Sequence, residues 1–308
     1  ALLVVAANEG IRPQTIEHLE IARLLGVRHG VVALTKCDLV PEDEARRVGR
    51  QAADLAASVG GWQEAACLRA SAVDGRGLDE LRGRLAALLR QIDPVDERGS
   101  FVLPVDRVFA VAGFGVVVTG TLRHGAIAAG DEVEVVPGCL RARVRGLQLH
   151  GRAVEQAGPG RRVAVNLRGL ERADLDRGAV LAPPGLLQPG RWLDVELRLL
   201  ATAARPLVGG ERLKLLIGTS ETAARLRLLD ENSLAPGAGA VAQLLAEEPI
   251  AAPALERFIL RVGSPPRTVG GGRVLIAASA RRRRGDDATM AFLRTIATAP
   301  PEEAVAAA

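Results

Sequence analysis

The sequence predicts a multidomain protein of 308 residues, with one parallel α/β unit followed by two antiparallel, all-β barrels. Strand-like and helix-like patterns alternate through the first ninety residues, which is the element order of a parallel sheet. After about residue 100 the apolar residues recur with a period of two instead. Many short runs of this kind, separated by regularly placed glycines, are typical of closed β-barrels.

The α/β unit begins with Leu2–Ala7, a continuous apolar run typical of a strand that is covered on both faces. Apolar residues at helical spacing follow and end at Gly26. The elements expected after them are a strand over Val31–Leu34, a helix that Pro41 opens, a strand over Ala66–Ala70 and a helix over Leu78–Leu88. This order predicts a parallel sheet with right-handed crossovers.

A polar, proline-bearing linker over Asp93–Ser100 separates the α/β unit from the first barrel. The strands expected in that barrel are Phe101–Val111, Val116–Thr121, Glu132–Val136 and Leu140–Leu149. A break rich in proline and glycine at 183–190 precedes the second group of strands: Leu193–Leu200, Leu213–Gly218, Ala223–Leu229, Ala240–Leu245 and Phe258–Val262. We therefore expect domains at 1–93, 99–185 and 188–276, with the start of a further, helical extension at 277–308.

The composition is that of a globular protein, with 48% hydrophobic and 25% charged residues. The formal net charge is +4, and nearly all of the positive charge is arginine, since the only lysines are Lys36 and Lys214. Arginine makes flat, bidentate contacts to phosphate, so this surface suits an RNA partner. A GC-rich coding bias would give the same composition, and both interpretations stay open.

Cysteine usage and hydropathy exclude several classes of protein. Cys37, Cys67 and Cys139 are widely spaced and form no CxxC pair, which argues against a zinc site or a disulfide framework. This pattern fits the reducing cytosol, and we expect a cytoplasmic protein without a bound metal on these residues. No apolar run of about 18 residues occurs, so no membrane partner is expected.

The sharpest functional signal is Thr35–Lys36–Cys37–Asp38, directly after a buried strand. In an open α/β sheet, ligands bind at the carboxyl ends of the strands. A carboxylate at Asp38 can accept two hydrogen bonds from the N1–H and the 2-amino group of guanine, a donor pair that adenine lacks. The stem of Lys36 can lie along the base. The alternative is that these residues only cap a strand.

A second element strengthens the guanine hypothesis. Ser71 and Ala72 follow the next strand and precede a glycine-bearing turn and a helix. A turn of small residues lets a backbone N–H approach the O6 atom of guanine. Because the two elements follow consecutive strands, they suit one base pocket better than an ordinary βα loop does.

At this point the chain resembles the translational GTPase family. Eight segments carry the resemblance: AANEGIRPQTIEHL (Ala6–Leu19), TKCD (Thr35–Asp38), SAVDGRGLDEL (Ser71–Leu81), FVLPVDRVFAVAGFGVVVTGTL (Phe101–Leu122), GDEVEVVP (Gly130–Pro137), RGAVLAPPG (Arg177–Gly185), LAPGAGAVAQLLAEEPI (Leu234–Ile250) and RFILRVGSPPRTVGGGRVL (Arg257–Leu275). The resemblance covers residues 1–276 and implies a partial P-loop-type GTPase domain before the two barrels. The family's guanine motif usually opens with Asn, and Thr35 stands in its place here.

Within the family, the chain is most similar to the bacterial selenocysteine-specific elongation factors. The segments Val144–Leu167 and Ile217–Asp230 favour that branch. The resemblance implies GTP or GDP with Mg²⁺ as ligands. It also implies three partners: selenocysteyl-tRNA, the ribosome and an mRNA recoding stem-loop. The stem-loop would be bound by a C-terminal domain beyond this chain.

The phosphate-binding motifs of the family are absent from the sequence. Neither a GxxxxGK[ST] loop nor an Asp-x-x-Gly-His segment occurs, and in the family both precede the part that resembles this chain. We therefore expect a fragment that lacks both ends and has no catalytic residue or metal ligand of its own. GTP hydrolysis is expected only of the full-length protein.

The resemblance implies that the aminoacyl end of the tRNA binds between the GTPase domain and the first barrel. Selenocysteine carries an acidic selenol, so its pocket should present positive charge. Our candidates are Arg107, which Asp106 would orient, and Arg162. His150 is a weaker candidate, because a histidine beside a glycine turn more often lies on the surface. The alternative is that Arg107 and Arg162 are ordinary exposed residues of their strands.

The other charged residues singled out by the sequence have less specific roles. We expect His18 to face solvent, and His29 and His124 lie in turns without a clear role. The run Arg281–Arg284 is either an RNA contact or a solvated hinge.

Three alternative functions remain at this stage. The chain could be another translational GTPase, such as elongation factor Tu or an initiation factor. It could be a non-catalytic paralogue that binds RNA through its barrels, although the intact guanine elements speak against this. A sulfate-assimilation GTPase is favoured least, because its motifs differ around the guanine site.

Overall fold

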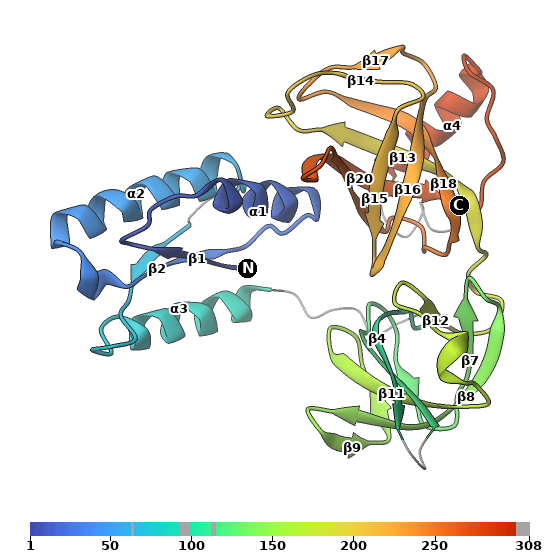
Figure 1. Ribbon diagram of the computed structural model, residues 1–308, viewed down its shortest axis with the longest axis horizontal. Helices are drawn as coiled ribbons and strands as arrows, with labels where there is room; N and C mark the ends of the chain where they lie inside the picture. The colour runs from blue at the N-terminus through green and yellow to red at the C-terminus, as the bar shows by residue number, and fades with distance from the viewer. Residues whose placement is uncertain (63–64, 93–98, 112–114, 300–308) are drawn as a thin grey trace. The chain divides into compact units, whose positions relative to one another are not determined.

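The computed structural model describes residues 1–62, 65–92, 99–111 and 115–299 and divides the chain into two compact units, Ala1–Pro94 and Val95–Ala308 (Figure 1). The predicted linker is described only at its ends, because 93–98 lie outside the described residues. In the described part of the chain, no helix is both long and apolar enough to cross a membrane.

The first unit is a three-stranded parallel sheet in the order β1-β2-β3, with helices on both faces (Figure 1). Helices α1 and α2 pack on one face through an apolar core that includes Leu19 and Ala52. Helix α3 packs on the other face through Leu88. The elements are β1 (Leu2–Ala6), α1 (Pro13–Leu24), β2 (Val31–Thr35), α2 (Glu42–Ser58), β3 (Cys67–Arg69) and α3 (Leu78–Gln91), with a short 3₁₀ turn, η1 (Cys37–Leu39).

The carboxyl ends of the three strands meet at one edge of this sheet. The N–H of Ala7, after β1, donates to the carbonyl of Thr35 at 2.8 Å, and the N–H of Cys37 donates to the carbonyl of Ala70 at 3.3 Å. Gly77, which opens α3, has φ +72°, and a side chain there would collide with the carbonyl oxygen of Arg69. The loops that follow the three strands are therefore held side by side.

The first barrel of the second unit closes because β11 pairs with both β5 and β8. Within the described residues the ring runs β11-β5-β4-β12-β7-β8, and an apolar core fills its interior. Its strands are β4 (Leu103–Val111), β5 (Gly115–Thr121), β6 (Ile127–Ala128), β7 (Glu132–Val136), β8 (Leu140–Leu149), β9 (Arg152–Val154), β10 (Gln156–Ala157), β11 (Arg162–Arg168) and β12 (Val180–Ala182), with a 3₁₀ turn, η2 (Arg172–Asp174).

The second barrel is closed in the order β13-β18-β16-β15-β19-β20. Leucine, isoleucine, valine and alanine side chains fill it, together with Phe258. Its strands are β13 (Gly190–Leu199), β15 (Arg212–Ile217), β16 (Ser220–Leu228), β18 (Gly239–Ile250), β19 (Arg257–Val262) and β20 (Arg267–Ile276), with β14 (Leu207–Val208) and β17 (Ser233–Leu234) forming a separate small sheet.

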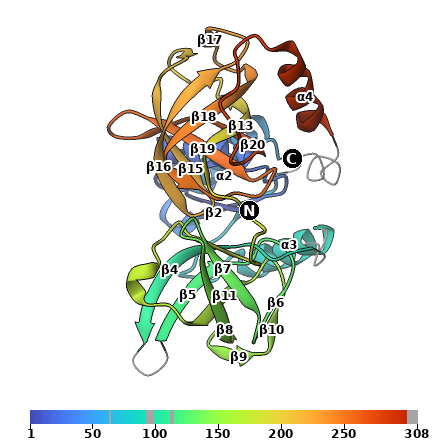
Figure 2. The same ribbon diagram turned by 90° about the vertical axis from the view of Figure 1, so that its right-hand side faces the viewer.

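The extension after the second barrel forms helix α4 (Asp287–Thr298), which contains the helical run expected from the sequence. The Asp286 side chain caps it by accepting from the N–H of Thr289 at 3.3 Å. Helix α4 lies along the side of the second barrel (Figure 2), and its buried residues Met290, Leu293 and Ile296 pack there on Leu229 and Leu275. The extension is therefore docked on the barrel at this point.

The predicted fold class is confirmed. A partial parallel α/β domain precedes two closed antiparallel barrels, each with six strands in its ring within the described residues. The boundaries predicted at 99–185, 188–276 and 277–308 stay predictions, since all three segments lie within one compact unit.

Candidate functional sites

The carboxyl edge of the parallel sheet brings together the residues that the sequence assigned to guanine. Thr35 ends β2, and its hydroxyl donates to the Val5 carbonyl of β1 at 3.4 Å. Lys36 has a left-handed backbone, φ 56° and ψ 34°, which turns the chain sharply into η1. The loop after β2 and the loop after β3 therefore adjoin, because the N–H of Cys37 donates a hydrogen bond to the carbonyl of Ala70, next to Ser71.

Lys36 is fixed by a residue that sequence reasoning did not single out. Its Nζ lies 3.1 Å from Oε1 of Glu9, which lies in the loop after β1. Both side chains are about half exposed, so this ion pair adds little stability and acts mainly on the direction of the lysine stem. In the sequence, Glu9 lies in the segment Ala6–Leu19 that resembles the translational GTPases, and no local pattern there marks it as a partner of Lys36.

Asp38 is half-buried within η1. Among the residues that the structure describes, no donor forms a hydrogen bond with its carboxylate, whose oxygens can therefore accept from a ligand. A carboxylate accepts through both oxygens, which suits a base edge with two adjacent donors.

The turn after β3 is built on a fully buried serine. The Ser71 hydroxyl accepts from the N–H groups of Val73 and Asp74 at 3.2 and 3.4 Å. The Ser71 N–H donates to the Arg76 carbonyl at 3.0 Å. Ala72, between these bonds, is exposed, and within the described chain its N–H has no acceptor. Ser71 therefore shapes the turn, while Ala72 offers the free donor.

The first barrel carries the candidate aminoacyl-pocket residues on its outer face. A β-bulge between Val105 and Arg107 makes Asp106 the extra residue of β4. Such a bulge redirects a side chain. The Asp106 carboxylate accepts from Nε and Nη2 of Arg162 at 3.1 and 2.9 Å, and from the Thr119 hydroxyl at 2.6 Å. Nη2 of Arg162 also donates to Thr119 at 3.1 Å.

The prediction that Asp106 orients Arg107 is wrong. The two oxygens of Asp106 hold Arg162, which lies across the sheet on β11, and within the described residues no hydrogen bond joins the Asp106 carboxylate to Arg107. Hydrogen bonds from Arg162 lower the pKa of Asp106, Thr119 adds to this effect, and the attraction of Arg107 comes last. Sequence reasoning also missed Thr119, whose role depends on a cross-strand position that a single sequence does not show.

The remaining sequence candidates are dispersed. His18 is exposed, as expected. His150 is also exposed, in a left-handed turn with φ 51°. The run Arg281–Arg284 is divided, because Arg282 forms an ion pair with the buried Asp194 of β13 at 2.8 Å. At this position the run is neither a hinge nor a free RNA contact.

Two protein families match the chain over separate segments. The family described as elongation factor Tu GTP binding domain matches residues 1–94. The family described as selenocysteine-specific elongation factor, beta-barrel domain, matches residues 194–281. The first segment contains the carboxyl edge with Asp38, and the second is the second barrel together with the start of its extension.

Curated relatives match most of the chain. A selenocysteine-specific elongation factor of Desulfomicrobium baculatum is 46% identical over 275 residues, which are 89% of this chain and 43% of the relative. Elongation factor Tu 2 of Streptomyces avermitilis is 34% identical over 292 residues, 89% of this chain and 73% of the relative. The chain thus spans less than half the length of the first of these relatives.

Solved structures have the same fold. A bacterial selenocysteine-specific elongation factor superposes with a TM-score of 0.81 and 26% identity, over 96% of this chain and 47% of that one. The apo form of translation elongation factor SelB from Methanococcus maripaludis gives 0.81 and 25%, over 89% and 64% of the chains. The same Methanococcus maripaludis protein in complex with the GTP analogue GPPNHP gives a TM-score of 0.78 at 23% identity, over 89% of this chain and 64% of that one.

Proposed function

Because the chain belongs to the elongation factor Tu family of translational GTPases, in its selenocysteine-specific branch, we propose that it is part of a GTP-dependent factor that delivers selenocysteyl-tRNA to the ribosome. The observation that carries this proposal is the match of the second barrel to the selenocysteine-specific barrel family at 194–281. Incorporation at recoded UGA codons, an mRNA stem-loop as further partner and a cytoplasmic location belong to the same proposal.

The carboxyl edge of the α/β unit would select guanine. The Asp38 carboxylate would accept from N1–H and the 2-amino group, and the free N–H of Ala72 would donate to O6. The Lys36 stem, held by Glu9, would cover one face of the base. Adenine presents no matching donor pair, so Asp38 would be left unpaired against it, and polar mismatches of this kind discriminate strongly.

Hydrolysis and Mg²⁺ binding are assigned to other parts of the longer protein. No phosphate loop occurs in this sequence, and within the described residues no cluster of three or more metal-ligating side chains could hold an ion. This chain would therefore contribute base selection, and no catalytic residue and no Mg²⁺ ligand are proposed among its residues.

The outer face of the first barrel would hold the amino acid end of the tRNA. Arg162 keeps 52% of its side chain exposed although two hydrogen bonds hold one edge of its guanidinium on Asp106. An arginine that is oriented but still open can attract an ionised selenolate more strongly than a neutral serine hydroxyl. Arg107, exposed on β4, would add the net positive charge that the Asp106–Arg162 pair lacks.

Base selection is tested with Asp38→Asn in the longer, GTP-binding protein. Asparagine presents one acceptor and one donor, which matches xanthine. We expect the preference for GTP over xanthosine triphosphate to fall by at least about 100-fold. Asp43→Asn, an exposed acid in the first turn of α2, is the control and should change nothing. An unchanged preference in Asp38→Asn would exclude this guanine site.

The tRNA assignment is tested with Arg162→Gln in the same protein. Binding of selenocysteyl-tRNA should weaken while binding of seryl-tRNA stays within about twofold. The control is Arg168→Gln, at the other end of β11 and also exposed. Equal losses for both tRNAs would remove Arg162 from the selenolate pocket. A wild-type protein that does not prefer selenocysteyl-tRNA over seryl-tRNA would contradict the proposed function itself.

A further inference from the structure

Three polar side chains form a row across the outer face of the second barrel. Asp194 of β13 pairs in register with Gln243 of β18, which pairs in turn with Arg227 of β16. Their strand neighbours, such as Leu226 and Leu244, point into the barrel core, so the three residues of the row share the outer face. Asp194 and Gln243 are nevertheless fully buried.

The start of the extension covers two members of this row. Gln243 donates from Nε2 to Oδ1 of Asp194 at 2.7 Å and to the carbonyl of Ala280 at 2.9 Å, and its Oε1 accepts from the N–H of Arg282 at 2.9 Å. The Arg282 guanidinium donates to Oδ2 of Asp194 at 3.0 and 2.8 Å. Asp194 and Gln243 are thus used to fasten the extension, and Arg281 is held between two bonded backbone groups.

Arg227, the third member, has no such partner. Its Nη1 is buried and makes no hydrogen bond within the described residues. Burial, together with repulsion from Arg281 and Arg284, lowers the pKa of Arg227. Asp230, the acid three residues further along the chain, is paired with Arg294 at 3.0 Å. A buried guanidinium donor without an acceptor is costly, so its presence calls for an explanation.

We propose that Arg227, Arg281 and Arg284 form a binding site for a phosphate of an RNA backbone. Guanidinium groups match phosphate oxygens in geometry and charge, and a bound phosphate would supply the acceptor that Nη1 lacks. Arg284 donates to the neutral Asn232 at 2.7 Å, so its positive charge stays available. The site would recognise the charge of a phosphate and not the base sequence. It is distinct from the selenolate pocket and the guanine site of the proposed function.

This assignment divides the basic run by role. Arg282 fastens the extension through Asp194, while Arg281 and Arg284 bind phosphate beside Arg227. Two backbone hydrogen bonds hold this part of the run next to β16: the N–H of Gly285 donates to the carbonyl of Leu229 at 3.1 Å, and the N–H of Arg282 donates to Gln243, the register partner of Arg227. Arg283 is exposed and has neither function, which makes it a matched control with the same charge.

The test measures binding of a 20-base-pair RNA duplex of arbitrary sequence to nucleotide-free protein, by fluorescence anisotropy at several salt concentrations. Arg227→Gln and Arg281→Gln should each weaken binding about tenfold at low salt. Each should also reduce the slope of log affinity against log salt concentration by about one, because one phosphate contact is lost. Arg283→Gln should stay within about twofold of the wild type.

Thermal unfolding of the same variants separates binding from folding. Arg227→Gln should not lower the melting temperature of the free protein, because it removes Nη1, a buried donor without an acceptor, from a side chain that is otherwise half-buried. Arg282→Gln should lower it, since this substitution leaves Asp194 buried without its arginine. A melting temperature lowered by Arg227→Gln would indicate a structural arginine and overturn the proposal.

Two competitors identify the ligand. RNA duplex should be displaced by inorganic phosphate only at millimolar concentrations, and this displacement should require Arg227. If polyglutamate of equal charge binds as tightly as the duplex and is equally sensitive to Arg227→Gln, the site is for an acidic protein and the RNA assignment is wrong. Equal effects of all the arginine substitutions would also contradict it. Because the binding assays contain no guanine nucleotide, none of these outcomes would contradict the proposed guanine site.

Discussion

The two barrels carry the same chemical arrangement in different surroundings. On each outer face an aspartate receives two hydrogen bonds from an arginine and one from a neutral side chain. In the first barrel the residues are Asp106, Arg162 and Thr119, and in the second they are Asp194, Arg282 and Gln243. Asp106 and Arg162 keep 30% and 52% of their side chains exposed, while Asp194 and Arg282 keep 0% and 27%.

This difference in burial separates positioning from fastening. We call this arrangement of an aspartate, an arginine and a neutral side chain a fork. Breaking a fork that is exposed to solvent costs little, because water replaces each lost hydrogen bond. The fork around Asp106 therefore serves mainly to direct Arg162. A buried carboxylate that loses its arginine has no such replacement. The fork around Asp194 therefore holds a segment of chain, and its arginine is not available to a ligand. The same residue types thus indicate a binding site in the first barrel and, in the second barrel, a structural contact that holds the extension in place.

The largest effect is expected from Asp194→Ala. It removes the carboxylate that satisfies both Gln243 and Arg282 inside the barrel face. Breaking a buried ion pair on one side typically costs about 3–5 kcal/mol, and we expect a loss in this range. Urea unfolding measures it, and amide exchange in α4 should accelerate because the structural contact before the helix is lost.

The counterpart substitution, Asp106→Ala, provides the control. It breaks the same arrangement in the first barrel, where Arg162 is half open to water. Its loss in unfolding free energy should be much smaller than that of Asp194→Ala, and exchange in α4 should not change. Equal losses for the two variants would show that burial is not what distinguishes the barrels.

The substitution Leu293→Ala tests whether the extension is held on the barrel mainly by the contacts of Asp194 or by the packing of helix α4. Leu293 is fully buried between α4 and the barrel. Removing a buried leucine side chain typically costs about 2–5 kcal/mol, and we expect about 2–3 kcal/mol because a helix at the barrel surface can settle into the space. Urea unfolding and limited proteolysis after residue 285 measure the effect. Combining it with Asp194→Ala should give less than the sum of the two losses, because both act on one docked segment.

Much of the fold was predictable from local patterns. The apolar runs and helical spacings of the first ninety residues gave the order of the parallel unit, since each of its elements buries a continuous face. The strand β20 was not predicted. Three consecutive glycines, Gly270–Gly272, lie within it, and glycine is depleted in strands. The structure explains them, because a side chain at Gly272 would collide with the Glu196 carbonyl of the neighbouring strand.

The candidate sites were predictable to a different degree. The guanine residues follow consecutive strands of a parallel sheet, so their sequence positions alone place them at one edge, where the structure has Thr35, Asp38 and Ser71. The partner of Asp106 could not be predicted in this way. It depends on a β-bulge and on a strand more than fifty residues away, and the burial of Asp194 depends on the docking of the extension.

A smaller effect is expected from Thr119→Val, which keeps the shape of the side chain but removes its hydroxyl. The hydroxyl makes one hydrogen bond to Asp106 and one to Arg162, and its loss should cost only about 1 kcal/mol in all, because water can replace both bonds at this partly exposed site. Hydrogen bonds from Arg162 and then Thr119 hold the pKa of Asp106 below 3.8, so this pKa should rise in the variant.

The change of the unfolding free energy at acid pH is the measurement that tests Thr119→Val. A lowered native pKa stabilises the protein above pH 3.8, and this stability is lost as the pH falls through the native value. The loss should therefore be smaller in the variant, and NMR titration of Asp106 measures the shift itself. Thr121→Val, on the same strand and exposed, is the matched control. An unchanged Asp106 titration would mean that Arg162 alone orients the carboxylate.

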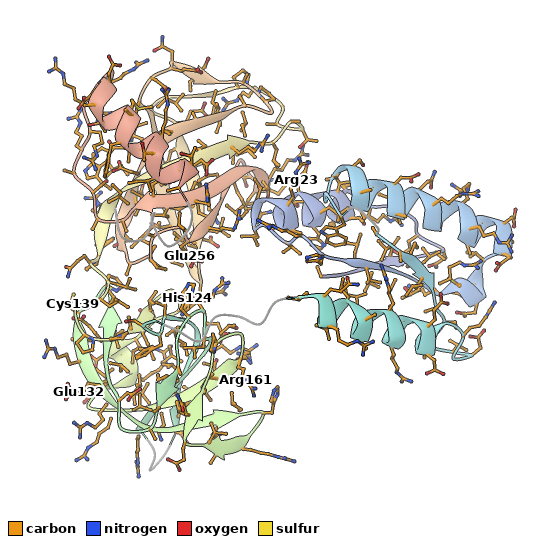
Figure 3. The ribbon with its side chains drawn as sticks, turned by 180° about the vertical axis from the view of Figure 1, so that it is seen from behind. Arg23, His124, Glu132, Cys139, Arg161 and Glu256 are labelled. Carbon is orange, nitrogen blue, oxygen red and sulfur yellow. The ribbon has the colours of Figure 1, made fainter. Side chains whose placement is uncertain are left out.

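Glu256 provides a third case, a buried carboxylate without a fork. It is labelled in Figure 3, lies just before β19 and keeps 11% of its side chain exposed. Its ion-pair partner is Arg123, 3.6 Å away, which follows β5 of the first barrel. Burial raises the pKa of Glu256 above 4.5, against the weaker opposing attractions of Arg123, His124 and Arg257. The attractions of Arg123, His124 and Arg257 together therefore do not compensate Glu256 for the loss of water.

The smallest effect is accordingly a change with pH, which Glu256→Gln should remove. A raised native pKa means that the stabilising contribution is complete below about pH 4.5 and is lost as the pH rises through the native value. The unfolding free energy of the wild type should therefore fall relative to that of Glu256→Gln as the pH rises above 4.5. Subtracting the two urea-unfolding profiles cancels the other carboxylates. A difference that stays constant from pH 4 to 8, or rises with pH, would show that Arg123 compensates Glu256 fully and that burial alone does not distinguish the three carboxylates.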